Sequence, residues 1–230
     1  MPDDHASTTT LRWGALKVLG DDAVAFVQSQ VSQDLEGDGA WPRWSALLDP
    51  DGTVVSAGVI SVIEGGLEFV VPAATVETAL ARLNRFRLRA RCTVTSESAV
   101  PGPYADRLDQ IRDGWPGPEE FAARLVAQSY GGRFVERTVS FTKGCFTGQE
   151  LVGRLDARAS SVPWRLVRAR GDSIEALHAF LRSTGPSGPS GPSGVTSWVR
   201  DGREFLALGF AHRTLLTESA PAGVAFEALP

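Results

Sequence analysis

The stretch Thr142–Arg158, TKGCFTGQELVGRLDAR, gathers residue types that are rare elsewhere in the chain. Among the 230 residues there are two lysines, Lys17 and Lys143, and two cysteines, Cys92 and Cys145. One of each therefore lies in the same short run, ahead of a Gly-Gln-Glu sequence and a pair of arginines. A plain loop does not need this combination, so the spacing indicates a site with chemistry of its own.

The second half of the stretch predicts a short helix. Thr147 and Glu150 fit the S/T-x-x-E capping box, in which each side chain satisfies a free backbone N–H at the helix start. We expect Thr147 to be the N-cap and the helix to run to about Asp156. Glu150, Arg154 and Arg158 follow at i, i+4 and i+8 and should line one face. Each exposed ion pair there contributes only about 0.3–0.5 kcal/mol.

The residues just ahead of this helix, Lys143 to Cys145, are the candidates for chemistry. Free backbone N–H groups and the helix macrodipole favour negative charge there, and a thiol next to a lysine gains thiolate character in such a place. If the backbone is extended, Lys143 and Cys145 point to the same side, and Gly144 lets the chain approach a ligand closely. The residues leave two interpretations open: a reactive or metal-binding thiol beside an anion-friendly pocket, or a buried cysteine in a tight loop.

The N-terminal part of the chain predicts an antiparallel sheet covered by helices. Two helices are expected: one that starts with an Asp cap and places Val24, Val27, Val31 and Leu35 at helical spacing, and an amphipathic one at 75–88. With the strands between them, the order β-α-β-β-β-α-β is typical of an α+β fold. The expected strands lie at 13–19, on both sides of the Asp-Pro-Asp-Gly turn at 49–52, at 67–72 and at 90–97.

The rest of the chain predicts short helices and then a small β-structure. Residues 98–140 are rich in Pro and Gly and should form loops around short helices, with 136–142 as a candidate strand. We divide the chain into an α+β region at 1–160, with a further division near 97, and a C-terminal small β-barrel at 161–230. The Gly-Pro-Ser repeat at 185–194 is expected to be a flexible loop within it. The short β-like runs that indicate the barrel are 164–170, 194–200, 204–213 and 223–229.

The composition argues against several classes of protein. A net charge of −4 gives no global positive potential that would attract nucleic acid. The many arginines could indicate an RNA-binding module, but genomic codon bias explains them equally well. The longest mostly apolar run, Val54–Ile63, is too short to cross a bilayer, and the acidic N-terminus does not suit a signal peptide. Two distant cysteines form neither a disulfide framework nor a metal motif. We expect a cytoplasmic protein with reduced thiols.

Lys143–Arg154, KGCFTGQELVGR, closely resembles the signature of the YgfZ-type folate-binding proteins, which runs Lys-Gly-Cys-Tyr/Phe-x-Gly-Gln-Glu-x-x-x-Arg. Other stretches agree more loosely. FVQSQVSQDL at 26–35 resembles the family's Phe-Leu-Gln-Gly-Gln-x-Thr-x-Asp helix, and ALLDPDGTV at 46–54 resembles the strand and turn that follow. GVTSWV and LALGFAHR resemble the C-terminal barrel, so the resemblance covers most of the chain.

This resemblance implies a fold and a function. The family is related to the aminomethyltransferase, or T-protein, of glycine cleavage. It implies tetrahydrofolate bound in a central cavity, a role in iron–sulfur cluster assembly or repair, and a link to tRNA modification. Cys145 would be the functional thiol. Because one thiol cannot fill the ligand sites of a cluster, a transient cluster would be shared with an iron–sulfur assembly protein, a client enzyme, a second copy or a small thiol.

The resemblance and the chemistry of folate together suggest which residues hold the cofactor. A reduced pterin ring needs a carboxylate and aromatic or apolar walls, and its anionic glutamate tail needs arginine. Trp115 with either Glu119 or Glu120 would face the ring, and Arg154 or Arg158 would face the tail. The predicted catalytic residues are Cys145 and Lys143, and the predicted cofactor-binding residues are Gln30, Asp34, Trp115, Glu119, Gly144, Gly148, Gln149, Glu150, Arg154 and Arg158.

One departure from the aminomethyltransferase pattern bears on the reaction. Where that enzyme carries its catalytic Asp, after the turn that contains Gly52, this chain has Ser56 and Ala57. Without the carboxylate, aminomethyl transfer lacks its acid/base group. A folate-binding accessory protein is therefore the leading hypothesis, and a folate-dependent one-carbon transferase with an altered substrate is the alternative.

Overall fold

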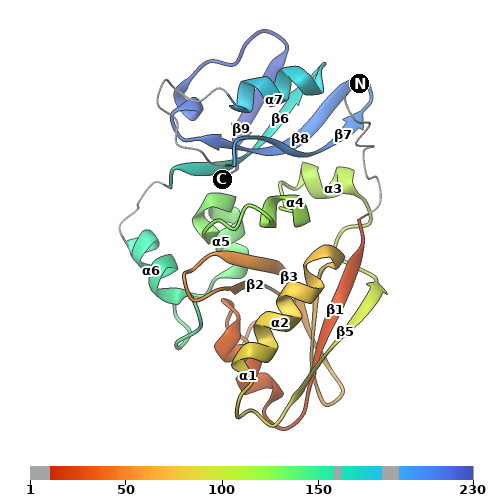
Figure 1. Ribbon diagram of the computed structural model, residues 1–230, viewed down its shortest axis with the longest axis vertical. Helices are drawn as coiled ribbons and strands as arrows, with labels where there is room; N and C mark the ends of the chain where they lie inside the picture. The colour runs from red at the N-terminus through yellow and green to blue at the C-terminus, as the bar shows by residue number, and fades with distance from the viewer. Residues whose placement is uncertain (1–10, 158–161, 183–191, 230) are drawn as a thin grey trace.

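The computed structural model describes residues 11–157, 162–182 and 192–229, which form two antiparallel β-sheets with helices between and around them (Figure 1). The first sheet has the strand order β2-β3-β4-β1-β5. Hairpin turns join β2, β3 and β4, as the Asp-Pro-Asp-Gly and Glu-Gly-Gly sequences predicted. The strands are β1 (Trp13–Leu19), β2 (Arg43–Leu48), β3 (Val54–Ile63), β4 (Gly66–Pro72) and β5 (Thr93–Val100).

Two helices, α1 (Ala23–Gln30) and α2 (Val76–Phe86), cover one face of the first sheet. Their apolar side chains share a buried cluster with Leu16, Leu47 and Ile60 of the sheet. This burial is the main reason that two short amphipathic segments are stable as helices. The predicted order β-α-β-β-β-α-β and the antiparallel α+β arrangement are confirmed.

Helix α1 is shorter than its apolar spacing predicted. It ends at Gln30, because Val31 turns away to pair with β2 as an isolated bridge. Val24, which was expected on the buried face, is 42% exposed. Asp22 occupies the N-cap position of α1, as predicted, but it makes no side-chain cap bond, because its carboxylate accepts hydrogen bonds from Arg91 instead. Tertiary pairing has overridden the local pattern here.

Short helices fill the space between the two sheets (Figure 1). A single buried cluster joins the first sheet, these helices and the second sheet, and its members include Leu48, Tyr130 and Phe210. The strand expected at 136–142 is wrong, because a helix covers its first half. The helices are α3 (Arg107–Arg112), α4 (Pro118–Phe121) and α5 (Gly132–Thr138), with a 3-10 turn at Ala127–Tyr130.

The C-terminal strands form a four-stranded sheet in the order β7-β8-β6-β9, with α7 (Ile174–Arg182) packed on its outer face. The predicted strands are confirmed. In the described part of this region no pairing joins β7 to β9, so the sheet is open and the predicted barrel is not seen. Residues 185–191 of the Gly-Pro-Ser repeat lie outside the described residues. The strands are β6 (Trp164–Gly171), β7 (Gly194–Asp201), β8 (Glu204–His212) and β9 (Val224–Ala228).

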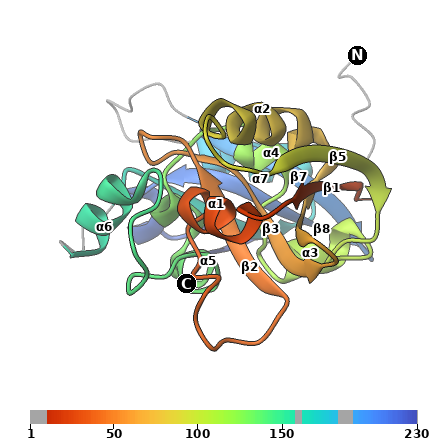
Figure 2. The same ribbon diagram turned by 90° about the horizontal axis from the view of Figure 1, so that it is seen from below.

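Helix α6 (Gln149–Ala157) lies at one side of the molecule, opposite β5 (Figure 2). Its buried residue Val152 belongs to the central cluster between the sheets. In the parts of the chain described above, no helix has the length and apolar character that crossing a membrane requires.

Candidate functional site

The signature loop, which comprises Lys143–Gly148, brings together segments that are far apart in the sequence. It contacts the end of α1 around Gln28–Gln33 and the β2–β3 turn at Asp49–Gly52, and it leads directly into α6. These segments include the three stretches 26–35, 46–54 and 143–154 that the sequence analysis singled out. Their meeting defines the candidate site.

The ammonium group of Lys143 is held at the end of α1. Its Nζ donates hydrogen bonds to the carbonyl oxygens of Gln28, Val31 and Gln33, at 2.7, 2.8 and 2.8 Å. Carbonyls at a helix C-terminus lack intrahelical partners and carry partial negative charge, so a cation there is favourable. Burial lowers the pKa of Lys143 to about 8, although the nearby Asp34 acts in the opposite direction. The lysine thus clamps the loop to α1, and its predicted catalytic role stays a prediction.

Two glycines let the signature loop pack directly on the β2–β3 turn. Gly148 has φ +85°, and a Cβ there would lie 2.6 Å from the Asp49 carbonyl oxygen. Gly52 has φ +82°, and a Cβ there would lie 2.9 Å from Cβ of Leu151. Both positions need glycine for conformation and for space. Gly144 differs, because a Cβ on it would meet nothing within 4 Å, so the described chain does not approach it closely.

The Cys145 thiol is free and exposed. The interpretation as a buried cysteine in a tight loop is therefore wrong. The Lys143 ammonium is turned inward to α1, whereas the Cys145 thiol is exposed. The Gln149 side chain folds back over the loop: its oxygen accepts from Phe146 N–H at 2.8 Å, and its nitrogen lies 4.0 Å from the sulfur. An adjoining pocket of about 100 Å³ is lined by Ser140, Phe141, Lys143, Phe146, Gln149, Val152 and Gly153.

Helix α6 begins at Gln149 without the predicted capping box. Thr147 does not cap it: the helix starts two residues later, and the hydrogen bonds of the Thr147 N–H and hydroxyl run to the end of α1. The Glu150 carboxylate pairs with Arg154 on the exposed face of the helix. This i,i+4 pair was expected, and it leaves both predicted cofactor-binding residues in solvent. Arg158 lies outside the described residues.

A buried arginine that the sequence pattern missed ties this site to α2. Arg82 is 5% exposed, and its guanidinium donates to the Leu48 carbonyl at 2.9 and 3.1 Å and to Gln30 Oε1 at 3.1 Å. Its Nε also lies 3.2 Å from Asp49. Gln30, predicted to bind cofactor, is thus buried beneath the β2–β3 turn. The available signal was a charged residue on the otherwise apolar buried face of α2.

Asp34 organises the loop that follows α1. Its carboxylate accepts from the Gln28 side chain at 2.8 Å and from Glu36 N–H at 3.1 Å. These hydrogen bonds, with a smaller contribution from the charge of Lys143, lower the pKa of Asp34. Asp34 therefore lies near Lys143, and its carboxylate is occupied by hydrogen bonds from α1 and from the loop that follows it.

A second group of aromatic and charged residues, the aromatic cluster, surrounds Trp115 just after α3. Trp115 is buried, and its ring centroid lies 4.2 Å from that of Trp44. The Arg137 guanidinium lies over both rings, 4.5 Å from the Trp44 centroid and 5.2 Å from that of Trp115, and donates to Asp113 at 2.8 Å. Trp115 Nε1 is buried and finds no hydrogen-bond partner among the described residues. Such an orphaned donor is unusual in a folded protein.

Gln33 links the aromatic cluster to the signature loop. Its side-chain amide donates to the Arg137 carbonyl at 3.2 Å, and its own carbonyl accepts from Lys143. The predicted residues therefore fall into two neighbouring groups, one around the signature loop and one around Trp115. The sequence offered no pattern that joins them, because the link runs through a residue of the loop after α1.

The two glutamates at 119 and 120 have different environments. Glu119 is 39% exposed at its side chain and pairs with Arg107 at 2.7 Å. Glu120 is fully buried and accepts hydrogen bonds from Gly117 N–H at 2.6 Å, from the Ser197 hydroxyl at 2.8 Å and from the Thr196 hydroxyl. Burial raises the pKa of Glu120 despite these donors. Glu120 thus joins α4 to β7, and neither carboxylate contacts Trp115 in the hydrogen bonds described.

The position at which the aminomethyltransferase pattern has its catalytic Asp carries no acid here. Ser56 is buried, and its hydroxyl lies 2.6 Å from that of Thr75. The pair is closed by a hydrogen bond from Thr75 to the Pro72 carbonyl at 2.8 Å. This part of β3 therefore offers a satisfied hydroxyl pair and no carboxylate.

Comparison with known proteins identifies the fold. No protein-family model matches the chain, and no curated protein sequence matches it. The glycine cleavage system aminomethyltransferase T from Bartonella henselae matches in structure with a TM-score of 0.56 and 14% sequence identity, over 96% of this chain and 83% of that one. The chain therefore has a fold similar to that of an aminomethyltransferase T, with antiparallel sheets and intervening helices.

Proposed function

We propose that this chain is a YgfZ-type folate-binding accessory protein that supports iron–sulfur cluster assembly or repair, and that this role extends to tRNA modification. The observation that carries the proposal is the convergence of the three resembling segments on a loop that presents an exposed thiol. The fold similarity to an aminomethyltransferase T supports the folate part. The iron–sulfur part rests on the signature residues alone.

The aromatic cluster is the best place for the flat ring of a folate. Trp44 is partly exposed and packs on the buried Trp115, whose Nε1 is a donor still in need of an acceptor among the described residues. The Asp113 carboxylate is held by Tyr104, Arg133 and Arg137, so a ring that binds it has to displace one of these partners. These groups fit a ring with donors and acceptors along its edge. The signature-loop pocket of about 100 Å³ is too small for such a ring by itself. When bound, a reduced folate would supply a one-carbon carrier or an electron donor.

In this proposal the signature loop provides the contact with partners. Cys145 is exposed and next to α6, so a partner thiol or cluster can reach it without unfolding the loop. Because no group of metal-ligating side chains forms within the described residues, a cluster would need ligands from an assembly protein, a client enzyme or a second copy. The working compartment is proposed to be the cytoplasm, where such thiols stay reduced.

Replacement of the thiol tests the proposal. We expect Cys145→Ser to keep the thermal midpoint of the wild type and to fail to restore iron–sulfur enzyme activity in cells that lack the endogenous protein. Ser140→Ala, at a residue that lines the small pocket, is the matched control and should restore activity. Full restoration by Cys145→Ser would remove the thiol from the mechanism.

A folate-dependent one-carbon transferase is the second candidate, because the similar structure is that of an aminomethyltransferase. The buried Ser56–Thr75 hydroxyl pair argues against it, since neither group is an acid or base near neutral pH. Incubation with methylene-tetrahydrofolate and candidate amines discriminates the two. Turnover above the rate without protein would favour the transferase, and its absence together with folate binding would favour the accessory role.

A further inference from the structure

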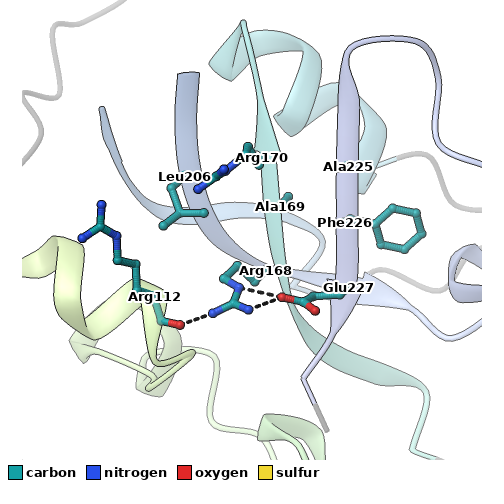
Figure 3. A pocket seen from close by; sticks show the side chains of 8 residues that line it. All are labelled: Arg112, Arg168, Ala169, Arg170, Leu206, Ala225, Phe226 and Glu227. Atoms are coloured by element: carbon teal, nitrogen blue, oxygen red, sulfur yellow. Dashed lines mark hydrogen bonds and ion pairs between the residues drawn. The ribbon is translucent and has the colours of Figure 1, made fainter. Parts of the chain in front are cut away.

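A pocket of about 500 Å³ lies between α3 and the C-terminal sheet, and it shares no lining residue with the signature-loop pocket (Figure 3). Arg112, at the end of α3, forms one wall. Arg168 and Arg170 form the other, because residues two apart on β6 point to the same face of the sheet. The remaining lining residues are Ala169, Leu206, Ala225, Phe226 and Glu227.

The lining carries more positive than negative charge. Arg168 is the best paired of its arginines: its Nε donates to Glu227 at 2.7 Å, another nitrogen binds the same carboxylate, and the third donates to the Arg112 carbonyl. Arg168 and Glu227 therefore neutralise each other. The other two positive charges of the lining belong to Arg112 and Arg170, whose acidic partners, Asp201 and Glu204, are not lining residues.

Arg112 and Arg170 form longer ion pairs than Arg168 does, and their side chains are more exposed. They share Asp201, at 3.1 Å from Arg112 and 3.4 Å from Arg170, and Arg170 has a further carboxylate, Glu204, at 3.5 Å. Their side chains are 50% and 48% exposed. Exposed ion pairs of this kind contribute little, and a guanidinium has five N–H donors, so most of the donor capacity is still available to a ligand.

We propose that this pocket binds a small organic molecule that carries at least two carboxylate or phosphate groups. Two acidic groups suit the site because Arg112 and Arg170 already pair with two carboxylates, Asp201 and Glu204, and a ligand has to compete with both of them. Each guanidinium matches a carboxylate or phosphate in its planar fork. An organic body is needed because the volume is within the range of small-molecule sites and Leu206 and Ala225 add apolar lining. The proposal stands on this pocket alone and is independent of folate binding.

Titration calorimetry with two probes tests this site. Citrate supplies carboxylates and glycerate 2,3-bisphosphate supplies phosphates, each at an ionic strength matched with NaCl, and acetate serves as the single-charge control. We expect at least one probe to bind with a dissociation constant below about 1 mM. The tighter probe tells which acidic group the site prefers.

Variants separate binding in the pocket from general electrostatic attraction. Arg112→Gln and Arg170→Gln should each weaken the preferred probe at least about tenfold. Arg85→Gln, an exposed arginine on α2, should leave binding unchanged. The proposal is overturned if neither probe binds at about 10 mM, or if both pocket variants, shown to be folded by their thermal midpoints, bind as the wild type does.

Discussion

In two regions of the molecule, a single ionisable side chain holds distant segments together. In the signature loop, Lys143 donates to three carbonyl oxygens at the end of α1. Between the sheets, Glu120 accepts from a backbone N–H of the α4 start and from two hydroxyls of β7. In both regions the partners are uncharged hydrogen-bonding groups, which reduces the cost of removing the side chain from water.

The two regions differ in their access to solvent. Glu120 is fully buried, and burial raises its pKa. Lys143 is only partly buried beside an exposed thiol, and its pKa is lowered to about 8, so its charge can be lost near physiological pH. We conclude that Glu120 holds α4 and β7 together at any pH near neutral, and we call it the fixed tie. Lys143 holds the loop that carries Cys145 against α1 through a charge that changes with pH, and we call it the adjustable clamp.

The largest effect is expected at the fixed tie. Glu120→Ala leaves the Gly117 N–H and the hydroxyls of Thr196 and Ser197 without their acceptor, and it opens a cavity between the sheets. We expect the free energy of unfolding, measured with urea, to fall by about 3–5 kcal/mol. Glu120→Gln should cost much less, because the hydroxyls can rotate to accept from the amide. If Glu120→Ala lowers the free energy of unfolding by less than about 1 kcal/mol, Glu120 does not hold α4 and β7 together as described.

The second-largest loss of stability is expected where the signature loop packs on the β2–β3 turn. Gly148→Ala places a Cβ 2.6 Å from a backbone oxygen at a φ of +85° and should cost about 2 kcal/mol. Gly144→Ala meets nothing within 4 Å and should change stability by less than about 0.5 kcal/mol. Equal losses in the two variants, compared by chemical denaturation, would mean that the loop does not rest on the turn.

The adjustable clamp predicts a specific pH dependence. The folded-state pKa of Lys143 is about 8 and its ordinary value is 10.5, so the unfolded chain holds the proton more tightly. Stability should therefore rise between about pH 8 and pH 10.5, by about 1–2 kcal/mol once the partial exposure of the group is allowed for. Lys143→Met should remove this rise, as judged from urea midpoints across the pH range.

The other lysine of the chain is the matched control for that experiment. A hydrogen bond to Glu97 raises the pKa of Lys17, so its contribution has the opposite sign and is lost as pH rises past its ordinary value. Lys17→Met should keep the rise that Lys143→Met removes. An unchanged slope in Lys143→Met would show that the clamp does not titrate in this range.

The smallest effect on stability is expected at the exposed face of α6. Arg154→Ala removes an i,i+4 pair with Glu150 and should cost less than about 0.5 kcal/mol. The same variant tests the predicted contact with a folate tail. An unchanged dissociation constant for folate would remove Arg154 from the binding site.

The sequence predicted the elements of the fold well because they depend on local periodicity and turn chemistry. The β2–β3 hairpin follows from Asp-Pro-Asp-Gly, and the order of the first sheet's elements follows from alternating apolar runs. The end of α1 and the open edge of the second sheet were missed, because they depend on backbone pairing with distant strands. A local sequence pattern does not specify which other strand an edge strand will pair with.

The candidate site was predicted in part for the same reason. The concentration of Lys143, Cys145 and Gly148 in one stretch indicated the loop, and the structure adds how it is held. The sequence did not predict the burial of Arg82, and it named Glu119 or Glu120 without choosing between them, because the partners of Arg82 and Glu120 come from other elements far along the chain. A charged residue is assigned to the surface by default, and only tertiary contacts reverse that assignment.

The most direct test of the account is calorimetric titration of the whole chain with tetrahydrofolate under anaerobic conditions. The account predicts saturable binding of one folate per chain with a dissociation constant of about 1–50 μM. No saturable binding up to about 1 mM folate would contradict it and would leave the similarity to the aminomethyltransferase as a likeness of fold alone.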